Sequence, residues 1–88
     1  MDHFSTSKLL KIASLFANSE KFQQAEAIYR TCLNRDPNNY EASFRLGLVL
    51  VTIGQVAHGL YFLERSVSIN PSSIDSYISY SGALIKSR

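Results

Sequence analysis

Residues 25–37 read AEAIYRTCLNRDP, and residues 59–71, which begin 34 positions later, read GLYFLERSVSINP. Both stretches place a small, a large and a small residue at matching positions before a proline: Ala25, Tyr29, Cys32 and Pro37, then Gly59, Leu63, Ser66 and Pro71. The residues upstream follow the same offset and align in three sets: Leu9, Ile12, Ala13 and Phe16; Ser43, Leu46, Gly47 and Leu50; Tyr77, Tyr80, Ser81 and Leu84. The chain therefore contains an internal repeat, and that repeat decides the fold.

The repeated pattern is typical of a helical hairpin. Leu9, Ile12 and Phe16 fall at i, i+3 and i+7, which places them on one stripe of a helix. Glycine costs roughly 1 kcal/mol relative to alanine inside a helix, so Gly47 and Gly59 indicate a close approach of two helices. We expect helices near residues 7–18, 22–35, 40–52, 56–69 and 74–86, and no strand.

Residues that begin and end helices stand at these boundaries. The candidate N-caps are Ser5 or Thr6, Asn38 or Asn39, and Ser72 or Ser73. Ser72 followed by Asp75 three residues later resembles a capping box. Asn18-Ser19 and Gly54 fit a tight turn inside each hairpin, and the two prolines close the second helix of each unit.

The composition is that of a globular protein, with 45% hydrophobic and 18% charged residues in a chain of 88. The net charge of +2 and the scattered basic residues argue against a nucleic-acid partner. The start of the chain does not resemble a signal peptide. The longest apolar stretch, residues 46–53, is too short to span a membrane. A single cysteine, Cys32, excludes an internal disulfide, and we expect a cytoplasmic protein.

These motifs resemble the tetratricopeptide repeat, whose signature is W-x2-L-G-x2-Y, then A-x3-F, then P, on a 34-residue period. Unit two departs from the signature at Ser43, where a large residue is expected, and at Gly59, where alanine is expected. The resemblance implies an all-α, tetratricopeptide-type right-handed superhelix of antiparallel helical hairpins (an α-α superhelix) with five helices. Residues 1–88 would form a single domain, with repeat one at 6–39, repeat two at 40–73 and a last helix at 74–86.

In this family the first helix of each hairpin lines a concave groove, where a peptide or helix of a partner protein lies. The resemblance therefore implies a groove formed by the side chains that flank the packing stripe: Leu10, Ser14, Phe44, Arg45, Leu48, Val51 and Ile78. The apolar members favour a hydrophobic segment or an amphipathic helix as the ligand. The alternative is that these side chains pack within the array, or that Phe44 turns to fill the gap left by Ser43.

One subclass of the family clamps the acidic C-terminal tails of heat-shock chaperones with Lys, Asn and Arg side chains. The corresponding positions here are Leu10, Ser14, Arg45, Asp75 and Ser79. None of them carries the required residue type in the required place, and Asp75 would repel a carboxylate. We therefore predict that such tails are not ligands of this chain.

Candidate reactive residues are few. Cys32 occupies a position where the repeat requires a small buried side chain, which favours a core residue over a catalytic thiol. His58 lies near the start of the fourth expected helix, and His3 lies in the terminal tail. The sequence has no HExxH, CxxC or glycine-rich phosphate loop. We therefore predict no enzymatic activity, no metal site and no cofactor.

Two functional hypotheses stay open. The first is a protein–protein interaction module that binds a peptide or helix in an apolar groove. The second is the substrate-recognition arm of a larger enzyme, such as a protein O-glycosyltransferase or a sulfotransferase, because similar arrays precede the catalytic domains of those enzymes. A nucleic-acid module is a third reading, which the small net charge disfavours.

The last expected helix has more apolar residues than one buried stripe can accommodate: Ile74, Tyr77, Ile78, Tyr80, Leu84 and Ile85. The final helix of such an array normally has a polar outer face. We therefore expect either that further repeats follow in the natural protein or that the chain forms a homodimer, with self-association through Ile74, Tyr77, Ile78 and Ile85. The alternative is that the hydroxyls of Tyr77 and Tyr80 reach water and the helix is tolerated as it stands.

Overall fold

The computed structural model describes residues 4–87, so His3 lies outside the described residues. It contains five α-helices: α1 (Thr6–Asn18), α2 (Phe22–Arg35), α3 (Tyr40–Thr52), α4 (Val56–Ile69) and α5 (Ile74–Lys86). Within residues 4–87 there is no strand. All five expected helices are confirmed to within one residue at each end.

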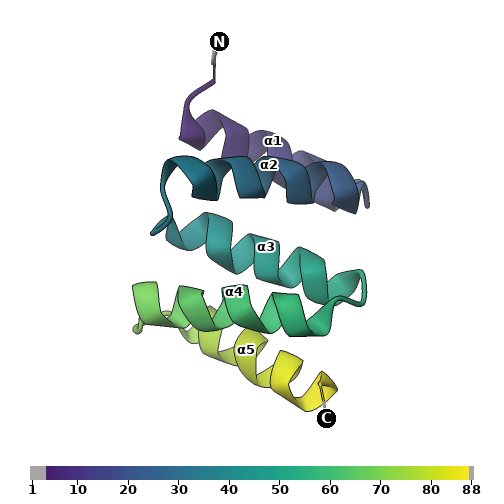
Figure 1. Ribbon diagram of the computed structural model, residues 1–88, viewed down its shortest axis with the longest axis vertical. Coiled ribbons are helices and arrows are strands. Elements are labelled where there is room, and N and C mark those ends of the chain that lie inside the picture. The colour runs from purple at the N-terminus through teal and green to yellow at the C-terminus, as the bar shows by residue number, and fades with distance from the viewer. Residues whose placement is uncertain (1–3, 88) are drawn as a thin grey trace.

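The helices stack in chain order as two antiparallel hairpins and a last helix (Figure 1). α1 packs on α2, α3 packs on α4, and α2 and α4 each pack on the helix that follows them. The odd-numbered helices also contact one another, so α1, α3 and α5 form one layer of the stack. The molecule is elongated, with extents of 42 × 26 × 17 Å.

Side-chain caps fix the start of each odd-numbered helix. The hydroxyl of Ser5 accepts a hydrogen bond from the backbone N–H of Lys8 at 3.1 Å, and the side chain of Asn39 accepts one from Ala42 at 2.9 Å. At α5 the cap is Ser73, which accepts from the backbone N–H of the third helical residue at 3.3 Å. Such caps satisfy backbone donors that have no partner within the helix.

The expected capping box between Ser72 and Asp75 is wrong. Ser72 lies before the cap position, and its hydroxyl donates a hydrogen bond to the side-chain oxygen of Asn70 at 3.0 Å. Asp75 lies in the first turn of α5, where a carboxylate is favoured by the helix dipole without any reciprocal cap.

Each hairpin turns through one residue in the left-handed region. Gly54 has φ +93°, and Glu20, which stands 34 residues earlier, has φ +61°. A glycine adopts this conformation without steric cost, whereas a residue with a β-carbon is strained by roughly 1 kcal/mol. The first hairpin therefore uses the same turn geometry as the second with a less suitable residue.

The helices of the second hairpin touch where their glycines meet. A β-carbon on Gly47 would lie 2.7 Å from Cγ of Leu63, and one on Gly59 would lie 2.5 Å from Cγ2 of Val51. A β-carbon at either position would force its neighbours to shift, so glycine is favoured at both. Ala13 and Ala25, which hold the equivalent positions in the first hairpin, are both fully buried.

The core runs along the interface of the first three helices. Its fully or almost fully buried members are Ala13, Ala25, Tyr29, Cys32, Ala42, Leu46, Val49 and Leu50. Ser43 is also fully buried, and its hydroxyl has no hydrogen-bond partner among the described residues. The ring of the next residue, Phe44, stacks on Tyr40 at 5.8 Å between centroids.

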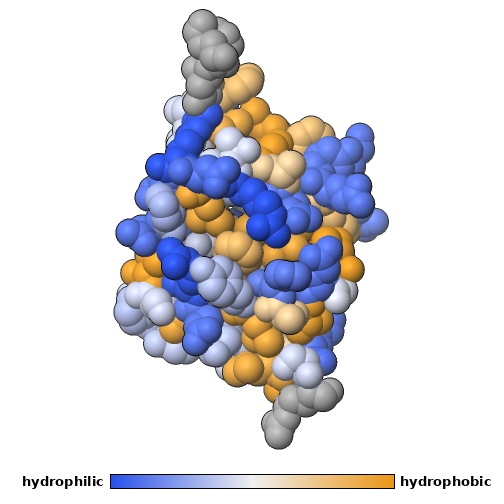
Figure 2. All heavy atoms as spheres, in the orientation of Figure 1, coloured by the Kyte–Doolittle hydropathy of each residue, from blue (hydrophilic) through white to orange (hydrophobic). Residues whose placement is uncertain are grey.

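The two ends of the stack expose positions that the middle buries. Leu15 of α1 is 66% exposed, whereas its equivalents Val49 and Ala83 are 5% and 2% exposed. A preceding helix covers the latter two, and none covers Leu15 within the described residues. Figure 2 shows apolar side chains at both ends of the stack as well as between them.

Candidate partner-binding hollow

A hollow of about 340 Å³ opens between α1, α2 and α3. Its lining combines an apolar base with polar groups: Ser14, Ala17, Asn18, Phe22, Tyr29, Arg45, Leu48, Val49 and Thr52. We call it the Tyr29 hollow. Its volume falls in the range that accommodates a small ligand or a side chain of a peptide.

Tyr29 brings a hydroxyl to this hollow from the core. The ring is fully buried, and the phenolic oxygen lies 3.2 Å from the hydroxyl of Ser14. Burial raises the pKa of Tyr29, while the hydrogen bond with Ser14 and the charge of Arg45 oppose the rise. The phenol therefore stays neutral near pH 7 and can donate or accept one hydrogen bond.

Arg45 supplies the positive charge of the hollow. Its guanidinium lies 3.5 Å from the carboxylate of Glu41, one helical turn earlier, and both side chains are about half exposed. An exposed ion pair of this kind contributes little to stability, so Arg45 can leave Glu41 for another partner at a small cost in free energy. Arg45 can therefore turn to a carbonyl or carboxylate oxygen of a bound peptide.

Three of the seven groove residues expected from the sequence lie together at the Tyr29 hollow: Ser14, Arg45 and Leu48. The other four have different surroundings. Leu10 packs against the core, and Phe44 stacks on Tyr40. Val51 lies against Gly59 of α4, and Ile78 is 64% exposed on α5.

Sequence reasoning missed the contribution of Tyr29 to the hollow. It was identified as a large core residue in the A-x3-Y motif, where Leu63 stands in the second unit. A buried tyrosine usually finds a hydrogen-bond partner for its hydroxyl. Unit one has a tyrosine where unit two has a leucine, so unit one must supply a partner for the hydroxyl. This difference is the sequence signal that could have located the hollow.

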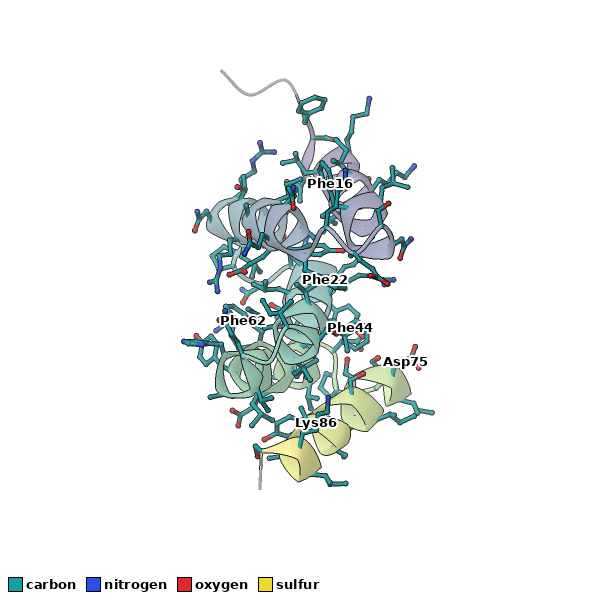
Figure 3. The ribbon with its side chains drawn as sticks, turned by 90° about the vertical axis from the view of Figure 1, so that its right-hand side faces the viewer. Phe16, Phe22, Phe44, Phe62, Asp75 and Lys86 are labelled. Atoms are coloured by element: carbon teal, nitrogen blue, oxygen red, sulfur yellow. The ribbon has the colours of Figure 1, made fainter. Side chains whose placement is uncertain are left out.

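The layer of even-numbered helices carries a separate aromatic cluster. The guanidinium of Arg30 lies 5.5 Å from the ring centre of Phe62, and Phe62 contacts Tyr61 edge to face. In Figure 3 Phe62 lies on the opposite side of the stack from Phe44 and Asp75.

The described residues include two of the candidate reactive groups, Cys32 and His58. Cys32 is fully buried, and burial raises the pKa of its thiol, which keeps it in the weakly nucleophilic neutral form. His58 is exposed near the start of α4. Across residues 4–87, no three His, Cys, Asp or Glu side chains are grouped so that they could hold a metal ion. None of the helices in that range has both the length and the hydropathy needed to span a bilayer.

Comparisons with known proteins agree with this architecture. The sequence profile of the family described as Tetratricopeptide repeat matches residues 9–39. No curated protein sequence matches the chain.

Solved structures match over nearly the whole chain. The C-terminal TPR-containing domain of a Plasmodium falciparum FK506-binding protein is 25% identical, with a TM-score of 0.86, and the match covers 92% of this chain and 54% of that one. The MamA RS-1 ArsTM double mutant is 28% identical, with a TM-score of 0.85, and the match covers 93% of this chain and 46% of that one. The chain thus spans about half the length of both structures. Residues 9–39 thus match the tetratricopeptide repeat family, and with its five helices and 34-residue period the chain has the fold of about two and a half such repeats.

Proposed function

We propose that this repeat array is a protein–protein interaction module that binds a peptide or helix of its partner at the Tyr29 hollow. The fold itself supports an interaction scaffold, since the repeat specifies packing and leaves the surface free for a ligand. The observation that carries the proposal is the grouping of Ser14, Arg45 and Leu48 around the hydroxyl of Tyr29. These residues come from the same layer as the expected groove, except Tyr29, which reaches it from α2.

The chemistry of the hollow defines the ligand. Phe22, Leu48 and Val49 offer apolar contact, while Arg45 and Asn18 offer donors at its edge. A ligand side chain of medium size with an acceptor oxygen beside it satisfies both. A tail rich in carboxylates does not, because Glu41 and Asp75 on the same layer repel it.

The proposal is tested with peptides selected on the immobilised protein from a displayed random library. The selected peptides are titrated by calorimetry into the wild type, Thr52→Arg and Leu15→Arg. Thr52 is exposed at the rim of the hollow, so an arginine there blocks the hollow without disturbing the core. We expect Thr52→Arg to weaken binding by at least about tenfold and Leu15→Arg, at the outer end of α1, to leave it unchanged. Equal binding to all three proteins would place the ligand elsewhere.

A peptide that ends in Glu-Glu-Val-Asp serves as the opposing probe. We expect no binding in the micromolar range, because the clamp positions carry Leu10, Ser14 and Ser79. Micromolar binding that is lost in Arg45→Gln would contradict the apolar assignment and favour an acidic ligand.

A second proposal is that the array is the substrate-recognition arm of a larger enzyme. It is favoured by the matched structures, which are about twice as long as this chain, and one of which is a domain of an FK506-binding protein. The DNA that flanks the coding sequence decides between the two proposals. A catalytic domain in the same frame supports the arm, and stop codons at both boundaries exclude it.

We further propose a cytoplasmic location, since Cys32 is a free thiol and a reducing compartment preserves it. Fractionation of cells that express the tagged chain tests this. Recovery in a membrane or secreted fraction would contradict it.

A further inference from the structure

The outer face of α5 is the counterpart of a face that α4 covers in the second hairpin. Leu50 of α3 is fully buried, and Val51 lies against Gly59 of α4. Their equivalents 34 residues later, Leu84 and Ile85, are 42% and 70% exposed. The corresponding side of the first helix is therefore covered by α4 in the second repeat and open to solvent on α5.

This open face has the spacing of a helix-pairing seam. Ile74, Ile78, Ser81 and Ile85 follow one another at intervals of four, three and four residues. Intervals of this kind keep side chains on one line along a helix and are typical of two-helix coiled coils. The three isoleucines are 64 to 73% exposed, and Ser81 is also exposed.

The area of the face suits a pair of identical chains. Five of the eight exposed large apolar residues in the described chain lie on α5: Ile74, Tyr77, Ile78, Leu84 and Ile85. Together they offer on the order of 500 Å² per copy, so a symmetric pair buries roughly 1,000 Å², which is the lower limit for a specific interface. A face of this size is comparable to the largest apolar patch of a typical monomer, which often marks an interaction site.

The charges beside the seam select the direction of pairing. Asp75 and Lys86 stand at opposite ends of α5 and are separated by 11 residues, or about 16 Å and three turns. They therefore lie on the same flank of the helix. When two copies pair antiparallel about a two-fold axis, these flanks lie on the same side of the interface and each Asp75 approaches Lys86 of the other copy. In a parallel pair the two flanks lie on opposite sides of the interface, and neither charge gains an opposite partner.

We propose that two copies of this chain form an antiparallel α5–α5 dimer along the seam of Ile74, Ile78, Ser81 and Ile85. In this arrangement Ile74 packs on Ile85 of the other copy, and Ile78 packs beside Ser81, whose small side chain allows the helices to approach closely. The dimer uses the end of the stack and leaves the Tyr29 hollow free, so one dimer presents two hollows.

Sedimentation equilibrium of the 88-residue chain tests the association. We expect a monomer–dimer equilibrium with Kd between about 1 and 100 µM, as befits an interface of this size. Ile78→Lys should raise Kd by about a hundredfold, because a symmetric interface loses the side chain twice. Leu15→Lys, a change of the same type at the other end of the stack, should leave Kd unchanged. A wild type that stays monomeric at millimolar concentration overturns the proposal.

Charge reversal tests the antiparallel direction. Asp75→Lys and Lys86→Asp should each weaken the dimer by about three- to tenfold, and the double variant should restore it, because both contacts are re-formed with opposite sign. A dimer that ignores both single changes, or that the double change weakens further, has a different geometry and overturns the proposal.

Disulfide trapping gives an independent check. Chains with Ile74→Cys and Ile85→Cys are mixed and oxidised; the native Cys32 is fully buried and does not compete. We expect the mixed 74–85 disulfide to form faster than either homodisulfide. Preferential 74–74 and 85–85 bonds would show a parallel pair. Trapping of neither, together with 1:1 binding of a synthetic peptide of residues 55–70, would show that the face takes an α4-like helix instead of a second copy.

Discussion

The carbonyl oxygen of Gly47 lies 2.9 Å from the point that a β-carbon on Gly59 would occupy. Backbone therefore faces backbone where α3 crosses α4, and the contact cannot be relieved by turning a side chain. We expect Gly59→Ala to lower the free energy of unfolding by about 1–3 kcal/mol, the usual cost of overpacking. Urea denaturation followed by circular dichroism measures the change.

Gly82 of α5 provides the matched control. A β-carbon there meets nothing within 4 Å, so Gly82→Ala should raise the free energy of unfolding by about 0.5–1 kcal/mol through helix propensity alone. Equal effects of the two substitutions would show that the α3–α4 contact is looser than described.

The turn residues Glu20 and Gly54 form a second matched pair. Glu20 has φ +61°, so Glu20→Gly should relieve strain and stabilise the protein by about 0.5–1 kcal/mol. The reverse change in the other hairpin, Gly54→Ala, should destabilise it by about 1 kcal/mol, although its β-carbon has open space, because φ is +93°. Thermal unfolding of both variants, with Glu20→Ala as the reference, decides the matter. A loss of stability in Glu20→Gly would contradict a strained turn.

Tyr40 connects α3 to the start of α5. Its hydroxyl lies 2.7 Å from the hydroxyls of both Ser73 and Ser76, and Ser76 is fully buried. We expect Tyr40→Phe to cost about 1–2 kcal/mol, since it removes two hydrogen bonds in a partly buried position. Amide hydrogen exchange should show the loss mainly in α5. Tyr61→Phe, which changes a ring that is 55% exposed, should alter stability by less than about 0.5 kcal/mol.

Alkaline pH should destabilise the fold through its two buried acids. Burial raises the pKa of Tyr29 from 10.0 and that of Cys32 from 9.0, so the folded state holds both protons more tightly than the unfolded state. Their stabilising contribution is complete below the unfolded pKa values and is lost as the pH rises above about 9 and then about 10. Denaturation curves recorded between about pH 8 and pH 11 should show this decline. In Tyr29→Phe the free energy of unfolding should fall less steeply above about pH 10. If it falls as steeply as in the wild type, Tyr29 does not cause the decline.

Local chemistry explains why the helices were predictable. Prolines, caps and the stripe of Leu9, Ile12 and Phe16 act within a few residues of themselves, so their meaning survives without the tertiary structure. Ser73 is confirmed as one of the two candidate caps of α5, and only the capping box of Ser72 with Asp75 was wrong. Both candidates are serines, and only the backbone geometry distinguishes them.

The candidate site was less predictable, because its lining depends on the rotation of each helix about its own axis. Leu48 and Val51 are less than one turn apart on α3, yet one lines the Tyr29 hollow and the other lies against Gly59. A difference of this kind depends on how far α3 is rotated against its neighbours, which a residue pattern does not report. The contribution of Tyr29 also required knowledge that its hydroxyl reaches Ser14 across two helices.

The contact order of the stack has a consequence for how the protein folds. Each helix packs on its immediate neighbours, and the farthest helix pairs in contact are only two apart in the chain. No long loop has to close before native contacts form, so the entropic barrier to folding is low and the rate should fall in the microsecond-to-millisecond range of helical proteins. Unfolding should begin at the terminal helices, because α1 and α5 have neighbours on one side, and α3, held on both sides, should open last.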